Sequence, residues 1–354
     1  MTASSSERFP AAARFDADFL ASVLQILYPA AKWDIICSVV TGDASDRQYF
    51  RLELRDTDGS DKKQSLIIMQ LANPVEGEET DFTRILKFLR QLNLPVPDLL
   101  HFDGEKGLLF LEDCGDITLE AEINRRPGDK PALYRQAVKL LWDMHQRATE
   151  NIQPDIPAHP LRFDVEKLMW EFDFMLEHYV GGHHRSALTL ADKQKIHQHF
   201  IPLCETLAAE PLVFTHRDYH CRNLMCVENE LVLLDFQDAR MGPCQYDLAS
   251  LLRDSYVEID YDLRLELIDY YIDLHDSQAQ IKIDRQKFLK IFDCMSIQRN
   301  LKAIGTFAFQ SVTKRNDRYL EYVPRTLGYV RETLSNRPEL DALAKVLQQY
   351  IPNL

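Results

Sequence analysis

The strand-like and helical patterns of this chain lie in different parts of its sequence. Apolar runs of strand length, with an amphipathic helix among them, occupy residues 35–111, whereas helical periodicity dominates from residue 117 onward. A run of strands followed by a run of helices is typical of the α+β class. We expect a flexible tail at residues 1–15, a small lobe of sheet and helix at residues 16–113, and a larger, mainly helical lobe at residues 114–354.

Each expected element follows from apolar periodicity and from the turn residues that flank it. In the first lobe, Asp16 caps a helix that runs to about residue 27, and Pro95 and Pro97 follow a second helix at 78–92. The strands predicted for this lobe are 35–41, 48–54, 65–71, 99–102 and 108–111. In the larger lobe we expect a strand pair at 224–227 and 231–236, and helices at about 117–124, 131–148, 164–180, 189–208, 246–255, 260–275, 284–310 and, with breaks, 318–350.

The composition disfavours several classes of protein. Of the 354 residues, 45% are hydrophobic and 27% are charged, which is typical of a folded globular chain. Asp and Glu outnumber Lys and Arg by 55 to 41, and the formal net charge of −14 disfavours nucleic acid as a partner. No apolar stretch approaches the ~18 residues of a membrane span, and residues 1–15 lack the apolar core of a secretory signal. The seven cysteines form no CxxC motif, which fits a reduced cytoplasmic protein, and no segment indicates an obligate protein partner.

The most informative motif lies just before the predicted strand pair of the larger lobe. His216-Arg217-Asp218 is followed by Asn223, five residues after the aspartate, which reproduces the kinase catalytic-loop pattern H-R-D-x-x-x-x-N, and Asp235 comes after the hairpin. Taken singly, these residues could be a turn former, an Asx-turn and a helix cap. Their order and spacing together favour phosphoryl transfer, in which one carboxylate lies beside the acceptor hydroxyl while the asparagine and the second carboxylate lie at a metal ion.

Four longer stretches extend this motif into a resemblance to a known superfamily. The stretches are 42–50 (GDASDRQYF), 109–116 (LFLEDCGD), 242–254 (GPCQYDLASLLRD) and 298–305 (QRNLKAIG). With the catalytic loop, they resemble the aminoglycoside-phosphotransferase-like, protein-kinase-like superfamily, and within it the bacterial anomeric N-acetylmuramate/N-acetylglucosamine kinases of cell-wall recycling. The resemblance implies a bilobal protein-kinase-like fold and transfer of the γ-phosphoryl of ATP, with Mg²⁺, to the anomeric hydroxyl of such an amino sugar.

The resemblance also assigns roles by position. It implies that Asp218 is the catalytic base, which accepts or orients the proton of the acceptor hydroxyl, and that Asn223 and Asp235 are Mg²⁺ ligands. Oxygen ligands of this kind are those that Mg²⁺ prefers. It further implies that His216 and Asp247 support the catalytic loop, Asp247 through backbone hydrogen bonds; a plain helix cap is the alternative for Asp247.

Nucleotide contacts are expected at the turn between the first two strands and at the join between the lobes. The turn at residues 42–46 could cradle phosphates with backbone N–H groups, and an ordinary hairpin turn is an equal alternative. The third strand lacks the lysine that protein kinases place there and has Met69 or Gln70 near that position, so the usual lysine–glutamate ion pair is not predicted. The candidates for nucleotide contacts are Gly42, Ala44, Ser45, Arg47, Glu112 and Cys114.

The expected acceptor site depends on charged residues of the larger lobe. Arg299 and Lys302 are three residues apart on one predicted helix, so they share a face. The lactyl carboxylate of N-acetylmuramate would suit such a cationic pair, and a surface ion pair with a nearby carboxylate is the alternative. Arg253 and Asp254, which follow a short predicted helix, complete the set of acceptor candidates.

Two other functions are open at this point. One is a kinase for an aminoglycoside or another small metabolite; a polycationic aminoglycoside favours an acceptor site rich in carboxylates, so the sign of the charge around Arg253 and Arg299 discriminates. The other is a pseudokinase that binds a nucleotide or a partner without catalysis. The absent strand-three lysine supports the pseudokinase, whereas the intact Asp218, Asn223 and Asp235 count against it.

Overall fold

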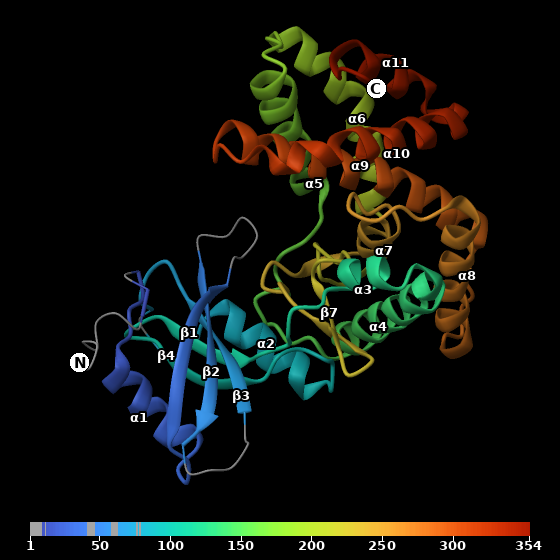
Figure 1. Cartoon of the computed structure of the whole chain (residues 1–354). Helices are drawn as coiled ribbons and strands as arrows, with labels where there is room; N and C mark the ends of the chain where they lie inside the picture. The colour runs from blue at the N-terminus through green and yellow to red at the C-terminus, as the bar shows by residue number, and fades with distance from the viewer. Residues whose placement is uncertain (1–8, 11, 41–46, 58–62, 76, 78) are drawn as a thin grey trace. The chain divides into compact units, whose positions relative to one another are not determined.

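The computed structural model describes residues 9–10, 12–40, 47–57, 63–75, 77 and 79–354. Its contacts divide the chain into two compact units, Met1–Asp116 and Ile117–Leu354. The first unit is built around a five-stranded sheet, and the second is mainly helical (Figure 1). The prediction of an α+β chain, with a sheet in its first part and a larger helical second part, is confirmed.

The sheet of the first unit is antiparallel throughout, with strand order β1-β2-β3-β5-β4. The register places Phe50, Ile68 and Phe110 side by side on three neighbouring strands, and all three side chains are buried, so an apolar row crosses the sheet. All five expected strands are present, and their ends differ from the predicted ends by at most two residues. The strands are β1 (Trp33–Val40), β2 (Gln48–Asp56), β3 (Lys63–Gln70), β4 (Leu99–Asp103) and β5 (Leu108–Glu112).

Two helices accompany this sheet, and each begins at a side-chain cap. Asp16 caps α1 (Ala17–Leu27), as predicted, by accepting a hydrogen bond from a backbone N–H of the first turn. The second helix, α2 (Asp81–Gln91), begins three residues later than predicted because Thr80 forms a capping box at its start. The end of the predicted tail packs on the sheet: Phe15 is buried and makes an edge-to-face contact with Phe50.

The second unit contains the expected helices, and one of them changes its winding within the predicted range. The helix expected at 164–180 is regular only to Met175 and continues with π-helical winding over Leu176–His183. The range 318–350, which was expected to be helical with breaks, contains α10 and α11 with 3-10 turns at Asp317–Tyr322 and Pro338–Leu340, so the expected breaks are confirmed. The helices are α3 (Leu119–Arg125), α4 (Lys130–Asn151), α5 (Val165–Met175), α6 (Leu190–Ala208), α7 (Gln245–Leu252), α8 (Tyr261–Gln278), α9 (Arg285–Val312), α10 (Val323–Asn336) and α11 (Asp341–Tyr350).

Two short strand pairs frame the predicted catalytic loop. The pair β7 (Leu224–Val227) and β8 (Glu230–Leu233) was expected, but β8 ends three residues early because the chain turns at Asp235, whose φ is 64°. The other pair, β6 (Leu212–Thr215) and β9 (Arg240–Pro243), was not predicted. Strands β6 and β9 lie far apart in the sequence and have no connecting turn of the kind that marks the β7–β8 hairpin, so no local signal predicted their pairing. Together the pairs fix where the loop starts and where it ends.

Helices α5 and α9 cross closely at Gly305. A Cβ atom at this position would lie 2.7 Å from the Cα of Met175, so the crossing requires glycine. The side chain of Gln298, on α9, donates a hydrogen bond to Glu171 of α5 at 3.1 Å. This approach places the polar residues of the two helices next to one another beside the catalytic loop.

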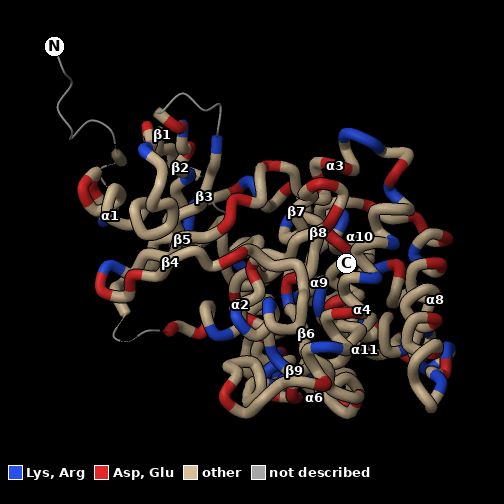
Figure 2. The backbone as a smooth tube through the Cα atoms, turned by 90° about the horizontal axis from the view of Figure 1, so that it is seen from below, with Lys and Arg blue, Asp and Glu red and all other residues tan. Residues whose placement is uncertain are grey.

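Charged segments of both signs are interspersed along the chain within each unit (Figure 2). Over the ranges that the structure describes, none of the helices combines the length and the apolar character that crossing a membrane requires.

Candidate active site

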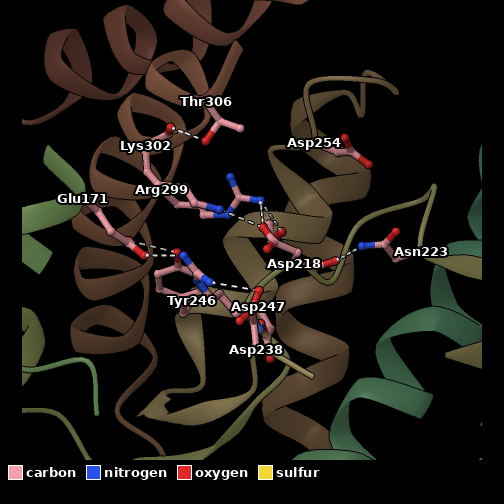
Figure 3. A network of polar contacts seen from close by, with 12 residues as sticks. Glu171, Asp218, Asn223, Asp238, Tyr246, Asp247, Asp254, Arg299, Lys302 and Thr306 are labelled. Carbon is pink, nitrogen blue, oxygen red and sulfur yellow. Dashed lines mark hydrogen bonds and ion pairs between the residues drawn. The ribbon is translucent and has the colours of Figure 1, made fainter. Parts of the chain in front are cut away.

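A buried carboxylate holds the first residues of the predicted catalytic loop. Asp247, in the first turn of α7, accepts hydrogen bonds from the backbone N–H groups of His216 at 2.7 Å and of Arg217 at 2.9 Å (Figure 3). The ring of His145, on α4, lies 3.1 Å from the same carboxylate, and its other nitrogen lies 2.8 Å from the hydroxyl of Tyr271. Asp247 is fully buried, so water does not compete for these contacts.

His216 connects the loop to the segment that follows the β7–β8 hairpin. Its Nε2 lies 2.8 Å from the backbone oxygen of Leu234, the residue before Asp235, and its side chain is fully buried. Cys244, not Asp247, is the N-cap residue of α7. The alternative in which Asp247 is a plain helix cap is therefore wrong, and its carboxylate serves the loop instead.

A second buried carboxylate, Asp254, holds the other end of the loop. Its two oxygens accept hydrogen bonds from the backbone N–H groups of Cys221 at 3.0 Å and of Tyr256 at 2.9 Å. Burial raises the pKa of Asp254, although these hydrogen bonds oppose the rise. From the sequence, Asp254 was expected to contact the acceptor. In the structure both of its oxygens face the backbone, which is the arrangement of a residue that supports the loop.

Between these anchors, two cations from α9 hold the carboxylate of Asp218. The Nζ of Lys302 lies 2.9 Å and the Nη2 of Arg299 lies 3.2 Å from the same oxygen, Oδ1 (Figure 3). Burial alone would raise the pKa of Asp218, but Lys302, Arg299 and Arg217 outweigh it and hold that pKa well below its usual range. Asp218 is therefore a carboxylate at neutral pH.

The second oxygen of Asp218, Oδ2, accepts no hydrogen bond from any residue that the structure describes. Arg299 is held in turn by the hydroxyl of Ser250, on α7, at 3.0 Å, and it is 7% exposed. The two cations expected at the acceptor carboxylate thus bind Asp218 in this structure. This geometry fixes one oxygen of Asp218 and leaves the other available for a hydroxyl group.

The hairpin brings Asn223 and Asp235 to its open end. Leu224 pairs with Leu233 in the β7–β8 register, and the backbone oxygen of Asn223 accepts a hydrogen bond from the N–H of Leu234 at 2.9 Å. The side-chain nitrogen of Asn223 donates to the backbone oxygen of Asp218 at 2.8 Å, which leaves its amide oxygen free to bind a metal (Figure 3). Asp235 is exposed and accepts one hydrogen bond from Gln237 at 2.7 Å.

The described residues contain no group of three or more His, Cys, Asp or Glu side chains that could hold a metal ion. An amide oxygen and a carboxylate are nevertheless a fitting pair of ligands for Mg²⁺, which keeps several water molecules and substrate phosphate oxygens in its other positions. Asn223 and Asp235 can hold Mg²⁺ in this way, whereas a zinc site of Cys and His ligands does not fit.

The candidates for nucleotide contacts lie in the first unit. Gly42, Ala44 and Ser45 lie outside the described residues. The guanidinium of Arg47 lies 5.7 Å from the centre of the Phe82 ring. At the end of β5, the side chain of Glu112 accepts a hydrogen bond from the backbone N–H of Asp98 at 3.1 Å, while Cys114 is buried and burial raises its pKa to about 12.

Gln70 stands at the end of β3, near the position where protein kinases carry a lysine. It is 6% exposed and donates hydrogen bonds to Gln48 at 2.8 Å and to the backbone oxygen of Ala12 at 2.9 Å. Its amide oxygen accepts one from the N–H of Arg14 at 2.7 Å. Gln70 therefore ties the N-terminal segment to the sheet instead of replacing the lysine at a phosphate.

Arg253 forms a buried ion pair with a residue of another helix. Its guanidinium makes two contacts with the carboxylate of Glu332, on α10, at 2.7 and 3.1 Å, and its side chain is 2% exposed. Arg264, on α8, binds the same carboxylate at 2.9 Å. This arrangement does not favour the expected contact of Arg253 with the acceptor. The N–H edge of the guanidinium that would bind a carboxylate of the acceptor already binds Glu332.

Replacing Arg253 by methionine should lower the free energy of unfolding by about 2 kcal/mol, because Glu332 loses two charge-assisted hydrogen bonds and keeps only Arg264. Urea denaturation measures this change. The matched control is Arg285→Met, which removes an exposed pair with Asp269 and should cost less than about 1 kcal/mol. If Arg253→Met left the stability unchanged and raised the KM for the acceptor, Arg253 would be assigned to the acceptor site.

Sequence reasoning missed three polar residues that shape this site: Glu171, Ser250 and His145. No local motif marks His145, and Ser250, although it lies in the stretch 242–254, was assigned no role, since each acts on a residue far away in the sequence. Glu171 did leave a signal, because it is an acidic residue among the apolar positions of the predicted helix 164–180. It is 1% exposed and contacts Tyr246, Gln298 and Arg217, at 3.1, 3.1 and 3.5 Å.

The sequence of the chain is similar to characterised families along most of its length. Residues 36–280 match the model of the phosphotransferase enzyme family. A protein of Neisseria meningitidis serogroup B named N-acetylmuramate/N-acetylglucosamine kinase is 30% identical over 331 residues, which cover 93% of this chain and 94% of that protein. A protein of Pseudomonas putida with the same name is 31% identical over 316 residues, or 88% of this chain and 87% of that protein.

Solved structures of lower sequence identity share the fold. Choline kinase from Cryptosporidium parvum superposes with a TM-score of 0.58 at 13% identity and covers 94% of this chain and 100% of its own. ADP-bound aminoglycoside phosphotransferase APH(2'')-Ib gives a TM-score of 0.54 at 14% identity, over 88% of this chain and 98% of its own. The matched family model, the long sequence relatives and the arrangement around Asp218 agree: the chain belongs to the phosphotransferase enzyme family.

Proposed function

We propose that this chain is an ATP-dependent kinase that phosphorylates the anomeric hydroxyl of N-acetylmuramate, and of N-acetylglucosamine, to give the 1-phosphate used in peptidoglycan recycling. Relatives named N-acetylmuramate/N-acetylglucosamine kinase, similar over about nine tenths of the chain, support the substrate class. The observation that carries the chemistry is Asp218, which has one oxygen fixed by Lys302 and Arg299 and the other open to a hydroxyl group.

In this proposal Asp218 orients the attacking hydroxyl. An ionised carboxylate accepts a hydrogen bond from the anomeric O–H through Oδ2 and so directs a lone pair of that oxygen at the γ-phosphorus. The lowered pKa makes Asp218 a weak base, and the proton moves to it only as the new O–P bond forms and the hydroxyl becomes acidic. Lys302 and Arg299 hold the carboxylate still, and Asp247 and Asp254 hold the loop that carries it.

Mg²⁺ is the cofactor that fits this site. Asn223, through its amide oxygen, and Asp235, through its carboxylate, would hold the ion. When bound, Mg²⁺ neutralises charge on the β- and γ-phosphates of the donor and orients them for transfer. Asn223 also donates a hydrogen bond to the backbone oxygen of Asp218, so the side chain that would hold the metal is tied to the residue that binds the acceptor.

ATP is the expected donor, and the cytoplasm is the expected compartment. Each of the seven cysteines is free, and burial raises the pKa of those at positions 114, 204, 221 and 294. Thiols that stay reduced and unreactive are typical of a reducing compartment. The nucleotide contacts proposed for Gly42, Ala44, Ser45, Arg47, Glu112 and Cys114 follow from the family resemblance.

An aminoglycoside is a poor match for the charges around Asp218. Lys302, Arg299 and Arg217 all raise the positive potential at this carboxylate. A polycationic acceptor would be repelled from such a site, whereas an amino sugar that is neutral or carries a carboxylate would not. The charge distribution therefore favours N-acetylated sugars over aminoglycosides as acceptors.

A panel of acceptors tests the proposed function directly. We expect purified protein with ATP and Mg²⁺ to release ADP in the presence of N-acetylmuramate and N-acetylglucosamine, and to release far less with kanamycin or without an acceptor. Turnover with kanamycin alone would support the aminoglycoside alternative. Binding of ATP without turnover on any acceptor would support the pseudokinase.

A further inference from the structure

A second group of cations consists of Lys167 on α5, Arg217 in the catalytic loop and Arg240 on β9. Arg217 reaches Glu171 at 3.5 Å and Asp238 at 3.4 Å, and the Nζ of Lys167 lies 3.9 Å from Glu171. The two cations thus share one fully buried carboxylate, and Asp238 is 59% exposed. These residues all belong to the second unit, and Arg217 directly precedes Asp218 in the chain.

Arg240 is the cation of this group that lacks a carboxylate partner among the described residues. It begins β9, opposite Thr215 of β6, and its guanidinium carbon lies 5.1 Å from the centre of the Phe163 ring. Its Nε is buried and makes no hydrogen bond with a described residue. The Phe163 ring is itself fixed, because it packs on Gly242 and stacks on Tyr246 at 4.0 Å.

The positive charges of this group are mutually unfavourable. Burial and the guanidinium of Arg217 lower the pKa of Arg240, while Glu171 opposes them. Burial likewise lowers the pKa of Lys167 to about 8, Glu171 opposes the change, and Arg217 and Arg240 add to it. Half-buried cations without full compensation are costly unless an anion joins them. The site is therefore poised to bind a negatively charged group.

We propose that Arg240 and Lys167 form an anion subsite that binds the carboxylate of the acceptor sugar. This inference rests on the proposed function and deepens it, because it names the residues that distinguish N-acetylmuramate from N-acetylglucosamine. Arg299 and Lys302, which were expected from the sequence to bind the carboxylate of the sugar, form ion pairs with Asp218 instead.

The placement of Arg240 suits the shape of the acidic sugar. Thr215, to which Arg240 is paired, lies three residues before Asp218, so the Cα atoms of Arg240 and Asp218 lie within about 16 Å of one another. In N-acetylmuramate the anomeric hydroxyl is on C1, the acetamido group is on C2, and the lactyl group that carries the carboxylate is attached to the oxygen on C3. A sugar with its anomeric oxygen at Asp218 therefore needs a cation a short distance away, and Arg240 has a long side chain to supply it.

The test compares the two sugars in Arg240→Gln and Lys167→Gln. We expect kcat/KM for N-acetylmuramate to fall by about 10- to 100-fold in Arg240→Gln, the range for a charge-assisted hydrogen bond, mainly as a raised KM. In Arg240→Gln, kcat/KM for N-acetylglucosamine, which has a hydroxyl in place of the lactyl group, should change less than about 2-fold. In the exposed control Arg285→Gln, kcat/KM should change less than about 2-fold for both sugars. Lys167→Gln should show the same selective loss, and Arg240→Lys should restore part of it.

The possible results distinguish a role of Arg240 in binding the sugar carboxylate from a role at the phosphates or in the fold. Equal losses for both sugars, or a raised KM for ATP, would overturn this inference and assign Arg240 to the phosphates or to the fold. No loss for either sugar would also overturn it. If Arg240→Gln does not fold, as judged by thermal melting, Arg240→Lys and Lys167→Gln still provide the comparison. A wild-type protein that phosphorylates neither sugar would refute the proposed function itself, which is a distinct result.

Discussion

Replacing Asp218 by asparagine should lower kcat by about 10²- to 10⁴-fold, while the Kd of ATP changes little. The amide keeps the shape of the side chain but cannot take the hydroxyl proton and orients the acceptor less well. It also leaves Lys302 and Arg299 without their carboxylate, so the free energy of unfolding should fall by about 2–4 kcal/mol. Steady-state kinetics well below the melting temperature, together with ATP titrations, separate these effects.

The matched control for Asp218 is Asp262→Asn, an exposed carboxylate on α8, for which kcat should stay within about 2-fold of the wild type. A variant at position 218 that keeps its kcat and loses only nucleotide affinity would show that Asp218 is not the residue at the acceptor. The pH profile adds a check. Because the pKa of Asp218 is held well below its usual range, protonation of this group should not reduce wild-type kcat between pH 8 and pH 5.

Replacing Asp235 by asparagine should lower Mg²⁺-dependent turnover by more than about 100-fold, because a ligand charge is lost at nearly constant shape. Asp235 is exposed and contacts Gln237, so the melting temperature without ligands should change little. Kinetics at increasing Mg²⁺ concentrations measure the effect, and high Mg²⁺ should restore part of the rate.

Normal turnover in a folded Asp235→Asn variant would contradict the assignment of Asp235 to the metal. A loss of turnover that no concentration of Mg²⁺ relieves, together with a lowered melting temperature, would instead point to a structural role. Asp262→Asn again serves as the control for the loss of one surface carboxylate.

The parts of this chain that could be predicted from sequence are those that local patterns encode. The strands of the first unit have clear apolar runs, and Asp16 marks a helix start through its own side chain. The spacing of Asp218, Asn223 and Asp235 is set by one loop and one hairpin, so it too is a local property. The unpredicted strands β6 and β9 are far apart in the sequence and acquire their structure from pairing with one another.

Contacts between residues that are distant in the sequence determine the rest of the site, and these contacts could not be predicted from local patterns. Arg253 looked available for an acceptor, but Glu332, far along the chain, binds it. Arg299 and Lys302 were correctly expected to share a helix face, yet nothing local indicates that this face meets Asp218. Arg240 and Lys167 escaped notice because their positions depend on the pairing of β9 and on the crossing of α5 and α9 at Gly305.

The position of the phosphoryl group in the product shows whether the enzyme phosphorylates the anomeric hydroxyl. The sugar should be incubated with ATP, Mg²⁺ and the wild-type protein, and the product examined by correlated ¹H–³¹P NMR. For an anomeric kinase we expect coupling of phosphorus to the proton on C1 and loss of the reducing end in step with ADP formation, for both N-acetylmuramate and N-acetylglucosamine. Coupling to the protons on C6 with the reducing end intact, or no sugar phosphate at all, would contradict this expectation.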